Sequence, residues 1–471
     1  RGVKMNSQNK LLKVIENDFC IGCGACASFP NSKVNIELNE YGMYKANLKK
    51  ANNEELTKLS NVCPFANTKD NESTIGQESF KNDCNYDEKI GYYLKTFAGY
   101  VKEDEFRRKG SSGGVATWLL TELLNLGYID GVVHVKTNKK DKDVLFKYAI
   151  SKTSEEIREG AKSRYYPIEM SQTIKEVRNL QGKYAFVGIP CFIKAIRLLS
   201  KEDNLFSKKV GFTISLFCGH LKSKNYLDYL IRKMGIEPKN VVYADFRKKV
   251  EGKPASDYAL EVVEEKGGEQ IIHTKMMKEL VSDPWGTGLF KYNACDYCDD
   301  VAGETADVTL GDAWLPEYVK DSGGTNIIII RNKKILEVFQ KAHEENRIYL
   351  ENLTPKDIIS SQIGNFRHRQ QELGYRLFLL EQKGKWYPEK RIKPSSKNIS
   401  KKRCLIQEYR LKLAKTSHDA YLKAINQNNI QVFEDIINPL IKKYRKLYKK
   451  NFVIRAISRI KRELSSKGEN N

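Results

Sequence analysis

The stretch Tyr184-Ala-Phe-Val-Gly-Ile-Pro-Cys191 has the composition of a buried β-strand that ends in a proline and a cysteine. Residues 192–200 then follow a helical pattern of apolar positions. The same order recurs at residues 210–217, an apolar strand pattern followed by Cys218-Gly-His220 and a helical pattern at residues 223–234. Buried strands that alternate with helices predict an α/β sheet, in which ligand sites form beyond the carboxyl ends of strands. We therefore expect both cysteines at one such edge.

A separate cysteine-rich stretch, Phe19-Cys-Ile-Gly-Cys-Gly-Ala-Cys26, has the Cys-x2-Cys-x2-Cys spacing of bacterial-type ferredoxins. Two residues between thiolates let one tight loop curl around a cubane, and glycines let backbone N–H groups approach its sulfides. The position of the usual fourth cysteine holds Pro30, and Cys63-Pro64 supplies a Cys-Pro pair further on. Structural zinc is the alternative, although zinc sites favour paired Cys-x2-Cys knuckles. We expect a 4Fe-4S cluster on Cys20, Cys23, Cys26 and Cys63.

Four cysteines in the second half of the chain can form another site. Cys191 and Cys218 follow the two strands, whereas Cys295 and Cys298 form a Cys-x2-Cys pair after an aromatic stretch. Thiolates that converge from three loops can hold a second 4Fe-4S cluster. The alternative is a zinc knuckle at the Cys-x2-Cys pair and two core cysteines, and spacing alone does not decide. His220, beside Cys218, is either a ligand, a proton donor or a capping residue.

A glycine- and serine-rich loop precedes an apolar helical pattern at residues 115–126. The loop is Gly110-Ser111-Ser112-Gly113-Gly114, and it follows the basic triplet Arg107-Arg108-Lys109. At a helix N-terminus such a loop presents free N–H groups, hydroxyl donors and the positive end of the helix dipole to an anion. It is neither a Walker A motif nor GxGxxG, and a plain N-cap is the competing interpretation. Beside two cluster sites it indicates a flavin, which joins one-electron carriers to organic substrates.

The chain resembles the family of coenzyme F(420) hydrogenase/dehydrogenase beta subunits. The resemblance spans residues 18–332, and its ordered motifs are the ferredoxin run, Ser112-Gly113-Gly114, Ser163-Arg164-Tyr165, residues 187–191, residues 216–219, Asp245-Phe246-Arg247-Lys248, residues 295–298 and residues 307–314. It implies an FAD-containing iron–sulfur oxidoreductase with both clusters, the loop near the flavin phosphates and Arg164 as an anion partner. A surface ion pair is the competing interpretation for Arg164. Arg247 and Lys248 would either face a cofactor or end a strand in solvent.

The composition is that of a folded protein. Of 471 residues, 40% are apolar and 30% charged, so the chain can bury a core large enough for roughly two or three domains. No run reaches the roughly 18 apolar residues of a spanning helix, and residues 1–10 lack the apolar stretch of a signal peptide. We therefore expect a cytoplasmic protein, in which cysteines serve metal or redox chemistry rather than disulfides. Cys84 and Cys404 stand alone and are expected to be inert thiols.

The expected fold is a mixed-sheet α/β body, preceded by a small ferredoxin-like module and followed by a helical basic extension. The expected boundaries are 1–89 for the ferredoxin-type module and a polar linker, 90–180 for a first body domain with the flavin loop, 181–383 for a second body domain with the second cluster, and 384–471 for the extension.

The extension is strongly basic. From Gly384 onward the chain has 23 Lys and Arg against 7 Asp and Glu, which accounts for most of the formal net charge of +22. Residues 436–464 place apolar side chains at helical intervals with basic side chains between them. Such a helix either binds an anionic membrane surface from its cytoplasmic side or packs its apolar stripe on the body. Nucleic acid is a weaker interpretation because few aromatic residues interleave with the charges.

These features predict an FAD- and iron–sulfur-dependent oxidoreductase. It would take electrons from a reduced carrier, ferredoxin or a deazaflavin, and reduce an organic substrate, or run in reverse. Because relatives with such extensions occur among enzymes of polysaccharide biosynthesis, the resemblance implies a small-molecule or glycan-related substrate. The competing functions are a non-catalytic electron-transfer subunit of a hydrogenase or dehydrogenase complex, and a zinc-stabilised binding protein. No catalytic acid is assigned, and His220 and Tyr165 are candidates only.

Overall fold

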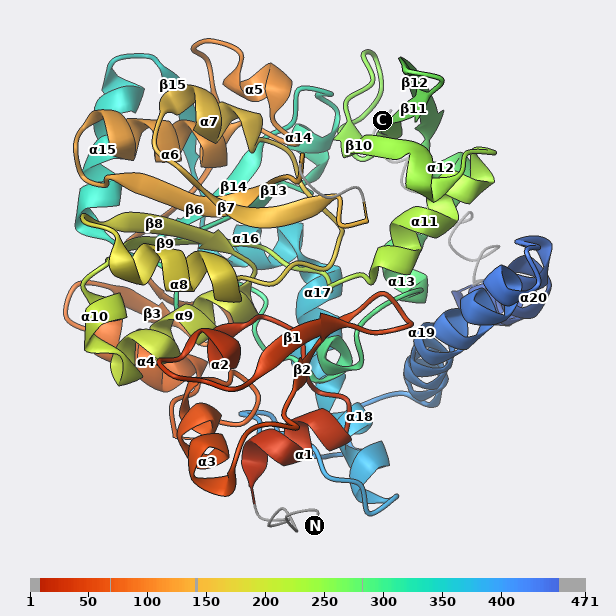
Figure 1. Cartoon of the computed structure of the whole chain (residues 1–471). Coiled ribbons are helices and arrows are strands. Elements are labelled where there is room, and N and C mark those ends of the chain that lie inside the picture. Colours follow the sequence, from red (N-terminus) through yellow and green to blue (C-terminus); the bar gives the residue numbers. More distant parts are fainter. Residues whose placement is uncertain (1–8, 68, 140–142, 282, 449–471) are drawn as a thin grey trace, which may run out of the picture.

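A mixed β-sheet forms the centre of the computed structural model, which describes residues 9–67, 69–139, 143–281 and 283–448 (Figure 1). Within these residues the sheet has eight strands in the order β15-β5-β14-β13-β9-β8-β6-β7. The strands are β5 (Lys95–Val101), β6 (Gly131–Thr137), β7 (Phe146–Ser151), β8 (Tyr184–Gly188), β9 (Val210–Leu216), β13 (Val308–Asp312), β14 (Asn326–Ile330) and β15 (Ile348–Asn352). β13, β9, β8 and β6 form a parallel run, and the outer pairs are antiparallel. The predicted mixed α/β class is confirmed.

β8 and β9 lie inside the parallel run because they are apolar on both faces. Residues 184–186 of β8 and Ile214 of β9 are buried, as expected of strands that are covered on both sides. The parallel register pairs Val187 with Ile214 and Gly188 with Ser215. The loops after both strands therefore leave the sheet at the same edge, as the sequence pattern predicts.

Helices cover both faces of the sheet (Figure 1). These helices are α6 (Val115–Asn125), α15 (Lys333–Glu344), α8 (Ser171–Asn179) and α9 (Pro190–Glu202). On one face, Trp118 of α6 and Phe339 of α15 share a core with Ala185 of β8. On the other face, Phe192 of α9 shares a core with Phe186 of β8. Because neighbouring residues of a strand point to opposite faces, the short apolar strand β8 supplies both cores.

The N-terminal segment packs directly on the body. It contains α1 (Lys10–Glu16), α2 (Ala25–Ser28), the hairpin of β1 (Asn35–Leu38) and β2 (Tyr44–Asn47), and α3 (Asn53–Val62). Leu56 and Leu59 of α3 belong to the same continuous core as Phe192 and Ile196 of α9. The cysteine-rich loop at residues 20–26 is thereby held against the body.

The segment at residues 70–89, expected as a polar linker, is folded. It forms α4 (Glu72–Phe80) and β3 (Asn85–Asp87), and β3 pairs with β4 (Gly91–Tyr93). Ile75 and Phe80 are buried, and Glu72 forms a buried ion pair with Lys194 of α9 at 3.1 Å. The linker expectation is wrong because some of the polar side chains in this segment bind partners inside the protein.

A smaller antiparallel sheet stands beside the body. It consists of β10 (Val241–Lys248), β11 (Ala259–Lys266) and β12 (Glu269–Met276). The helices next to it along the chain are α11 (Lys224–Lys233), α12 (Met277–Leu280) and α13 (Pro284–Thr287). The other short elements are α5 (Phe106–Lys109), α7 (Ser154–Glu159), α10 (Asn204–Ser207), η1 (Pro238–Asn240), η2 (Asn293–Tyr297) and α14 (Pro316–Val319). The chain leaves β10 at Lys249, which contacts the glycine- and serine-rich loop through the carbonyl of Ser112.

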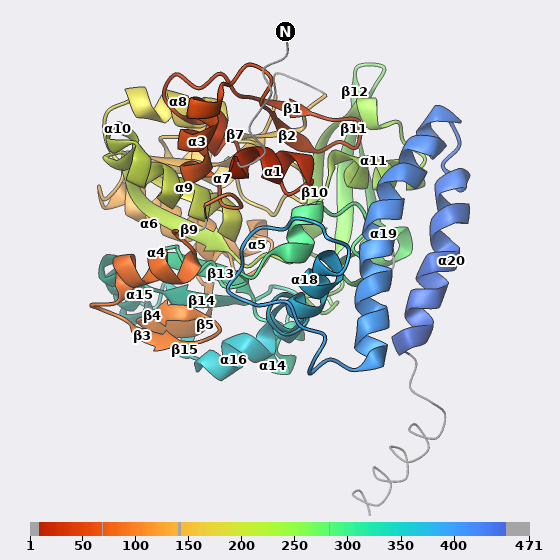
Figure 2. The ribbon, with the colours of Figure 1, turned by 90° about the horizontal axis from the view of Figure 1, so that it is seen from below.

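The C-terminal region is helical and packs on the body (Figure 2). Its elements are α16 (Pro355–Ser361), α17 (Ile363–Phe366), the π-helical turn η3 (Arg367–Gln371), α18 (Leu373–Glu381), and the helical hairpin of α19 (Lys401–Asn426) and α20 (Gln431–Tyr448). Phe433, Ile437 and Tyr444 of α20 are buried, and the Phe433 ring centroid lies 4.6 Å from that of Tyr229.

The basic amphipathic helix expected at residues 436–464 is seen in part. α20 ends at Tyr448, and residues 449–464 lie outside the described residues. Because the stripe of Ile437 and Tyr444 is buried, the described part of this helix packs its apolar side on the protein. Among the described residues, no helix has the length and apolar character needed to cross a membrane.

We predict that Ile437→Ala lowers the free energy of unfolding by about 2–5 kcal/mol, because it removes a fully buried side chain and leaves a cavity. Chemical denaturation monitored by circular dichroism measures this change. Lys442→Ala, an exposed position of the same helix, is the control and should change stability by less than about 0.5 kcal/mol. Equal stability of the Ile437→Ala variant and the unchanged protein would show that α20 is not part of the core.

Candidate redox site

The first cysteine set surrounds one small cavity. Cys20, Cys23, Cys26 and Cys63 all line a space of about 20 Å³. Cys26 lies in α2, and Cys63 ends α3. Gly24 has a left-handed backbone with φ of 89°, and a Cβ atom there would lie 2.7 Å from the backbone nitrogen of Ser171. Only glycine fits this turn, so the loop can bring its thiols together and pack on α8 at once.

Burial makes the free thiolates of Cys23, Cys26 and Cys63 unfavourable. It raises the pKa of Cys26 well above its usual value, and the charges of Cys23, Cys20 and Cys63 raise it further. Burial also raises the pKa of Cys63, to about 11. The backbone N–H groups of Gly22 and Ala46 each donate to Cys20 Sγ at 3.4 Å. Grouped, buried thiols of this kind suit a cationic iron core, which binds the deprotonated form.

The structure gathers the second cysteine set at the edge where β8 and β9 end. Cys191 opens α9 just beyond β8, Cys218 follows β9, and Cys295 and Cys298 come from η2 and the residue after it. Burial raises the pKa of Cys191, and the charges of Cys298, Cys218 and Cys295 raise it further. Each of the four thiols therefore lies within electrostatic reach of others in the set.

Neither set has the spacing of a single-ion site. Within the described ranges, no group of three or more His, Cys, Asp or Glu side chains is close enough to hold one metal ion. The sulfur ligands of a zinc ion lie roughly 2.3 Å from it, whereas a cubane is wider and keeps its thiolates further apart.

The two cysteine sets are neighbours. Cys23 of the first set is among the charges that raise the pKa of Cys191 in the second, after burial and the other thiols of that set. Tyr292 is fully buried, and its pKa is raised by burial and by one thiol from each set, Cys20 and Cys295. Its hydroxyl accepts a hydrogen bond from the backbone nitrogen of Tyr44 at 2.8 Å. Tyr292 thus links the N-terminal hairpin to the cysteine loop of η2.

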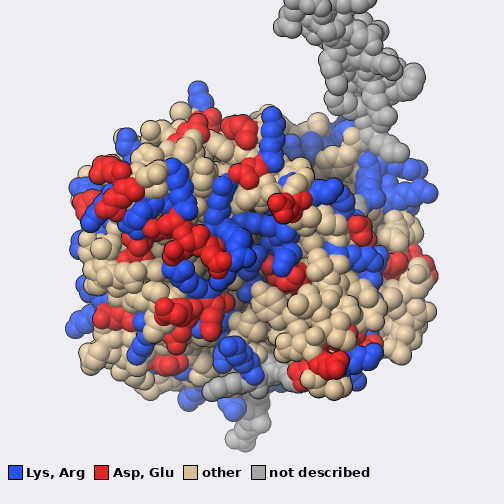
Figure 3. All heavy atoms as spheres, turned by 90° about the horizontal axis from the view of Figure 1, so that it is seen from above, with Lys and Arg blue, Asp and Glu red and all other residues tan. Residues whose placement is uncertain are grey.

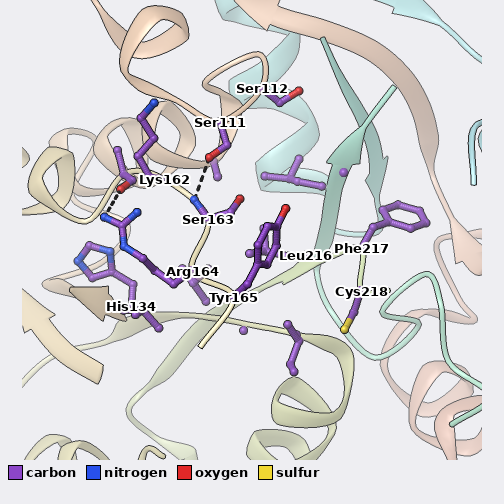
Figure 4. A pocket seen from close by; sticks show the side chains of 18 of the residues that line it. Ser111, Ser112, His134, Lys162, Ser163, Arg164, Tyr165, Leu216, Phe217 and Cys218 are labelled. Atoms are coloured by element: carbon purple, nitrogen blue, oxygen red, sulfur yellow. Dashed lines mark hydrogen bonds between the residues drawn. The ribbon is translucent and has the colours of Figure 1, made fainter. Parts of the chain in front are cut away.

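A larger cavity of about 280 Å³ joins the glycine- and serine-rich loop to the second cysteine set. Figure 4 shows Ser111, Lys162 and Arg164 at one end of this cavity and Cys218 at the other. The walls between them include apolar and aromatic side chains such as Leu216. The cavity therefore combines a polar, basic end with an apolar middle and a cysteine ligand candidate.

The loop at residues 110–114 is rigidly held. Ser111 Oγ accepts a hydrogen bond from the backbone nitrogen of Ser163 at 2.8 Å, and Ser112 Oγ donates to the carbonyl of Thr325 at 2.9 Å. Four of the five loop residues line the cavity, namely Gly110, Ser111, Ser112 and Gly114. Gly113 instead faces the protein, where a Cβ atom would lie 2.7 Å from the carbonyl oxygen of Gly99. A substitution at Gly113 would thus disturb the fold before it reached a ligand.

Arg164 is a half-buried cation with unused donors. Its Nη2 donates to the carbonyl of Ala161 at 3.0 Å, and its guanidinium lies 4.9 Å from the ring centroid of Phe146. Its Nε and Nη1 are buried and have no hydrogen-bond partner among the described residues. Because unpaired buried donors are costly, the geometry fits an anion that would accept from them in the cavity.

Arg247 and Lys248 have structural partners. Arg247 is buried and forms a two-pronged ion pair with Asp312 at 3.0 and 3.1 Å. Lys248 pairs with Glu261 at 2.8 Å on the surface of the small sheet. The expectation that Arg247 ends a strand in solvent is wrong, because Asp312 from β13 neutralises it inside the protein. Tyr165 joins this group, since its hydroxyl accepts from Arg247 at 3.4 Å.

Lys249 is a site residue that sequence reasoning missed. Its Nζ donates to the carbonyls of Arg107 at 2.5 Å, Ser112 at 2.7 Å and Gly323 at 2.5 Å. Burial lowers its pKa to about 7. Lys249 therefore holds the backbone of the loop in place through these hydrogen bonds. It directly follows the Asp-Phe-Arg-Lys motif, so its place in the sequence was the available signal.

Trp285 is a second missed residue. Its ring lies 4.7 Å from Tyr165 and 4.8 Å from His220, measured between centroids, and it lines the large cavity. The C-terminal hairpin holds the turn that carries Trp285, because Arg410 Nη2 donates to the Trp285 carbonyl at 3.2 Å and Tyr444 donates to the Gly286 carbonyl at 2.8 Å. The extension thus shapes the cavity wall.

His220 faces the same cavity beside Cys218. Burial lowers its pKa well below the usual value, and the positive charges of Lys222 and Lys291 lower it further. Its Nε2 is buried without a hydrogen-bond partner in the described part of the chain. A neutral histidine whose ring nitrogen is unpaired can donate one hydrogen bond to a bound molecule, or accept one from it, depending on its tautomer.

Two ranges of the chain match the two parts of one protein family. The N-terminal part of the coenzyme F420 hydrogenase/dehydrogenase beta subunit matches residues 96–175, and the C-terminal part matches residues 181–356. The chain belongs to this family. The matched residues carry the loop, Arg164 and the second cysteine set, while the first cysteine set and the extension lie outside them.

Individual relatives are distant. One of the subunits of the F(420)H(2) dehydrogenase of Methanosarcina mazei is 23% identical over 380 residues, which cover 77% of this chain and 94% of that protein. The beta subunit of the coenzyme F420 hydrogenase of Methanosarcina barkeri is 24% identical over 258 residues, or 54% of this chain and 80% of that protein. A chain in a structure of the F420-reducing NiFe hydrogenase complex from Methanosarcina barkeri matches with a TM-score of 0.47 and 20% identity, covering 63% of this chain and 96% of that chain.

We predict that Cys23→Ala lowers iron and acid-labile sulfide by about one cluster per chain, because an alanine cannot replace a thiolate ligand. Metal analysis of anaerobically purified protein measures both. Cys404→Ala, which removes a partly buried thiol outside both sets, is the matched control and should keep the full content. Full iron and sulfide in the Cys23→Ala variant would refute the assignment of the first set.

Proposed function

We propose that this relative of the F420 hydrogenase/dehydrogenase beta subunits is an oxidoreductase that holds FAD and two 4Fe-4S clusters. It passes electrons between a reduced carrier and an organic substrate. The observation that carries the proposal is the single cavity bounded by the glycine- and serine-rich loop and Arg164 at one end and by Cys218 at the other. A cofactor in this cavity would contact an anion-binding end and a cluster ligand at once.

The basic end of the cavity suits the diphosphate of FAD. The N-terminus of α6, the Ser111 hydroxyl and the unpaired donors of Arg164 all favour a negative group there. Lys162 lines the same end, where its ammonium is paired with the buried carboxylate of Asp245 at 2.9 Å. The apolar middle, with Leu216 and Trp285, suits a planar ring system. When bound, a flavin exchanges one or two electrons and iron–sulfur clusters exchange one, which is what a junction between them requires.

The protein packing supports a relay. The two cysteine sets lie beside each other around Tyr292, and Cys218 of the second set lines the flavin cavity. Buried side chains exclude water from the space between these sites, which protects reduced centres from side reactions. The chain itself therefore supplies position, exclusion of water and electrostatic balance.

The carrier that we propose is ferredoxin or a deazaflavin, and the substrate is a small or glycan-related organic molecule. Relatives named for F420 dehydrogenase, hydrogenase and sulfite reductase activities favour the deazaflavin. Figure 3 shows Lys and Arg side chains gathered near the centre of one face of the molecule. Asp and Glu side chains lie beside them on the same face (Figure 3), so the positive charge is a local patch, which can attract an anionic carrier or substrate.

A second candidate function is electron transfer within a larger complex, without a substrate of its own. It is favoured by two relatives that are named as subunits, one of an F(420)H(2) dehydrogenase and one of a coenzyme F420 hydrogenase. The two functions differ in what the purified chain does alone. An enzyme turns over carrier and substrate by itself, whereas an electron-transfer subunit needs a partner protein with which it forms a stable complex.

We predict that Arg164→Gln weakens FAD binding by about tenfold to a hundredfold, because a hydrogen bond to a charged group contributes about 1.5–3 kcal/mol. Titration of flavin-free protein with FAD, followed by fluorescence, measures the dissociation constant, and iron content should not change. Arg158→Gln is the control, since Arg158 pairs with Asp104 on the surface at 2.9 Å. Equal FAD affinity in both variants would count against the proposed flavin site.

A further inference from the structure

Arg369 reaches the second cysteine set from outside the part of the chain that the family matches. It lies on the π-helical turn η3, beyond residue 356. Its side chain is buried, with 2% of the residue exposed. Nη1 donates to Cys298 Sγ at 2.8 Å, and Nη2 donates to Cys218 Sγ at 3.9 Å. One guanidinium therefore contacts sulfur atoms from two of the three loops that form the set.

Backbone carbonyls hold this guanidinium in place. Nη1 also donates to the carbonyl of Asp300 at 2.8 Å, and Nη2 donates to the carbonyl of Gly219 at 2.6 Å. These carbonyls belong to the same two loops as the cysteines. Arg376 in turn fixes η3, because its Nη2 donates to the carbonyl of His368 at 2.7 Å. The position of Arg369 is thus set independently of the sulfur contacts.

The sulfur atoms that Arg369 contacts belong to Cys298 and Cys218, from two of the loops of the second set. A guanidinium stays protonated in proteins, so it is a permanent positive charge here. The sulfur atoms of the first set differ, since their hydrogen bonds within the described ranges come from backbone N–H groups such as those of Gly22 and Ala46.

We propose that Arg369 raises the reduction potential of the second cluster. This proposal rests on the proposed function, which places a 4Fe-4S cluster on Cys191, Cys218, Cys295 and Cys298. Reduction adds one electron and makes the cluster and its thiolates more negative. A buried cation that donates hydrogen bonds to two ligand sulfurs stabilises this reduced form more than the oxidised form. Without Arg369 the cluster is harder to reduce.

The test is a redox titration of the full chain, purified anaerobically, with dithionite as the reductant and electron paramagnetic resonance as the readout. In Arg369→Gln the midpoint potential of the second cluster should fall by at least about 59 mV, which is a tenfold change in a one-electron equilibrium constant. Arg369→Lys keeps the charge without the planar fork and should give an intermediate value. The Cys23→Ala variant, which keeps the second set, identifies the signal of that cluster.

Arg367→Gln is the matched control, because Arg367 lies on the same turn but is largely solvent-facing, with 45% of its side chain exposed. The cluster potentials of the Arg367→Gln variant should equal those of the unchanged protein. The first cluster should keep its potential in every variant. An unchanged second-cluster potential in Arg369→Gln overturns the proposal. So does loss of the second cluster from both Arg369 variants, which would make the residue purely structural. If the unchanged protein itself holds iron and sulfide for one cluster only, the proposed function fails, and that outcome is separate.

Discussion

Parallel pairing of β8 with β9 brings the loops after both strands to one edge of the sheet, and the rest of the site is arranged around that edge. Cys191 and Cys218 stand there because each directly follows its strand. β13 continues the parallel run beside β9 and brings Asp312 to the same region. The loop before α6 meets this edge from the antiparallel side of the sheet, where Val101 of β5 hydrogen-bonds to the carbonyl of Gly113. The cavity is what remains between these loops.

The C-terminal helices help to build the site. Arg376 of α18 donates to the carbonyl of Asp296 in η2 at 2.7 Å and to Gln407 of α19 at 2.7 Å. Asp296 also forms a buried ion pair with Lys291 at 2.5 Å. Such a network is stabilising only when all members are paired, so it specifies one position for the loop that carries Cys295 and Cys298. The region beyond the family match thus determines where two ligand candidates lie.

Local sequence patterns predicted the parts of the site that depend on neighbours in the chain. The strand-cysteine-helix order of residues 184–191 predicted the sheet edge, and the glycine-rich loop predicted a helix N-terminus. Arg369 was not predictable in this way, because it lies about seventy residues from Cys298 and its role comes only from tertiary contact. Lys249 directly follows the Asp-Phe-Arg-Lys motif, but its hydrogen bonds to the loop come only from tertiary contact. The linker expectation failed because the polar composition of residues 70–89 does not reveal that Glu72 pairs with the buried Lys194.

In the proposed function, one chain holds two 4Fe-4S clusters and a flavin around this edge. The most direct test is to measure iron, acid-labile sulfide, zinc and FAD in the anaerobically purified full chain. We expect about eight iron and about eight sulfide atoms per chain, one FAD and no stoichiometric zinc. Zinc in place of iron and sulfide, without bound flavin, would contradict it and favour a zinc-stabilised binding protein.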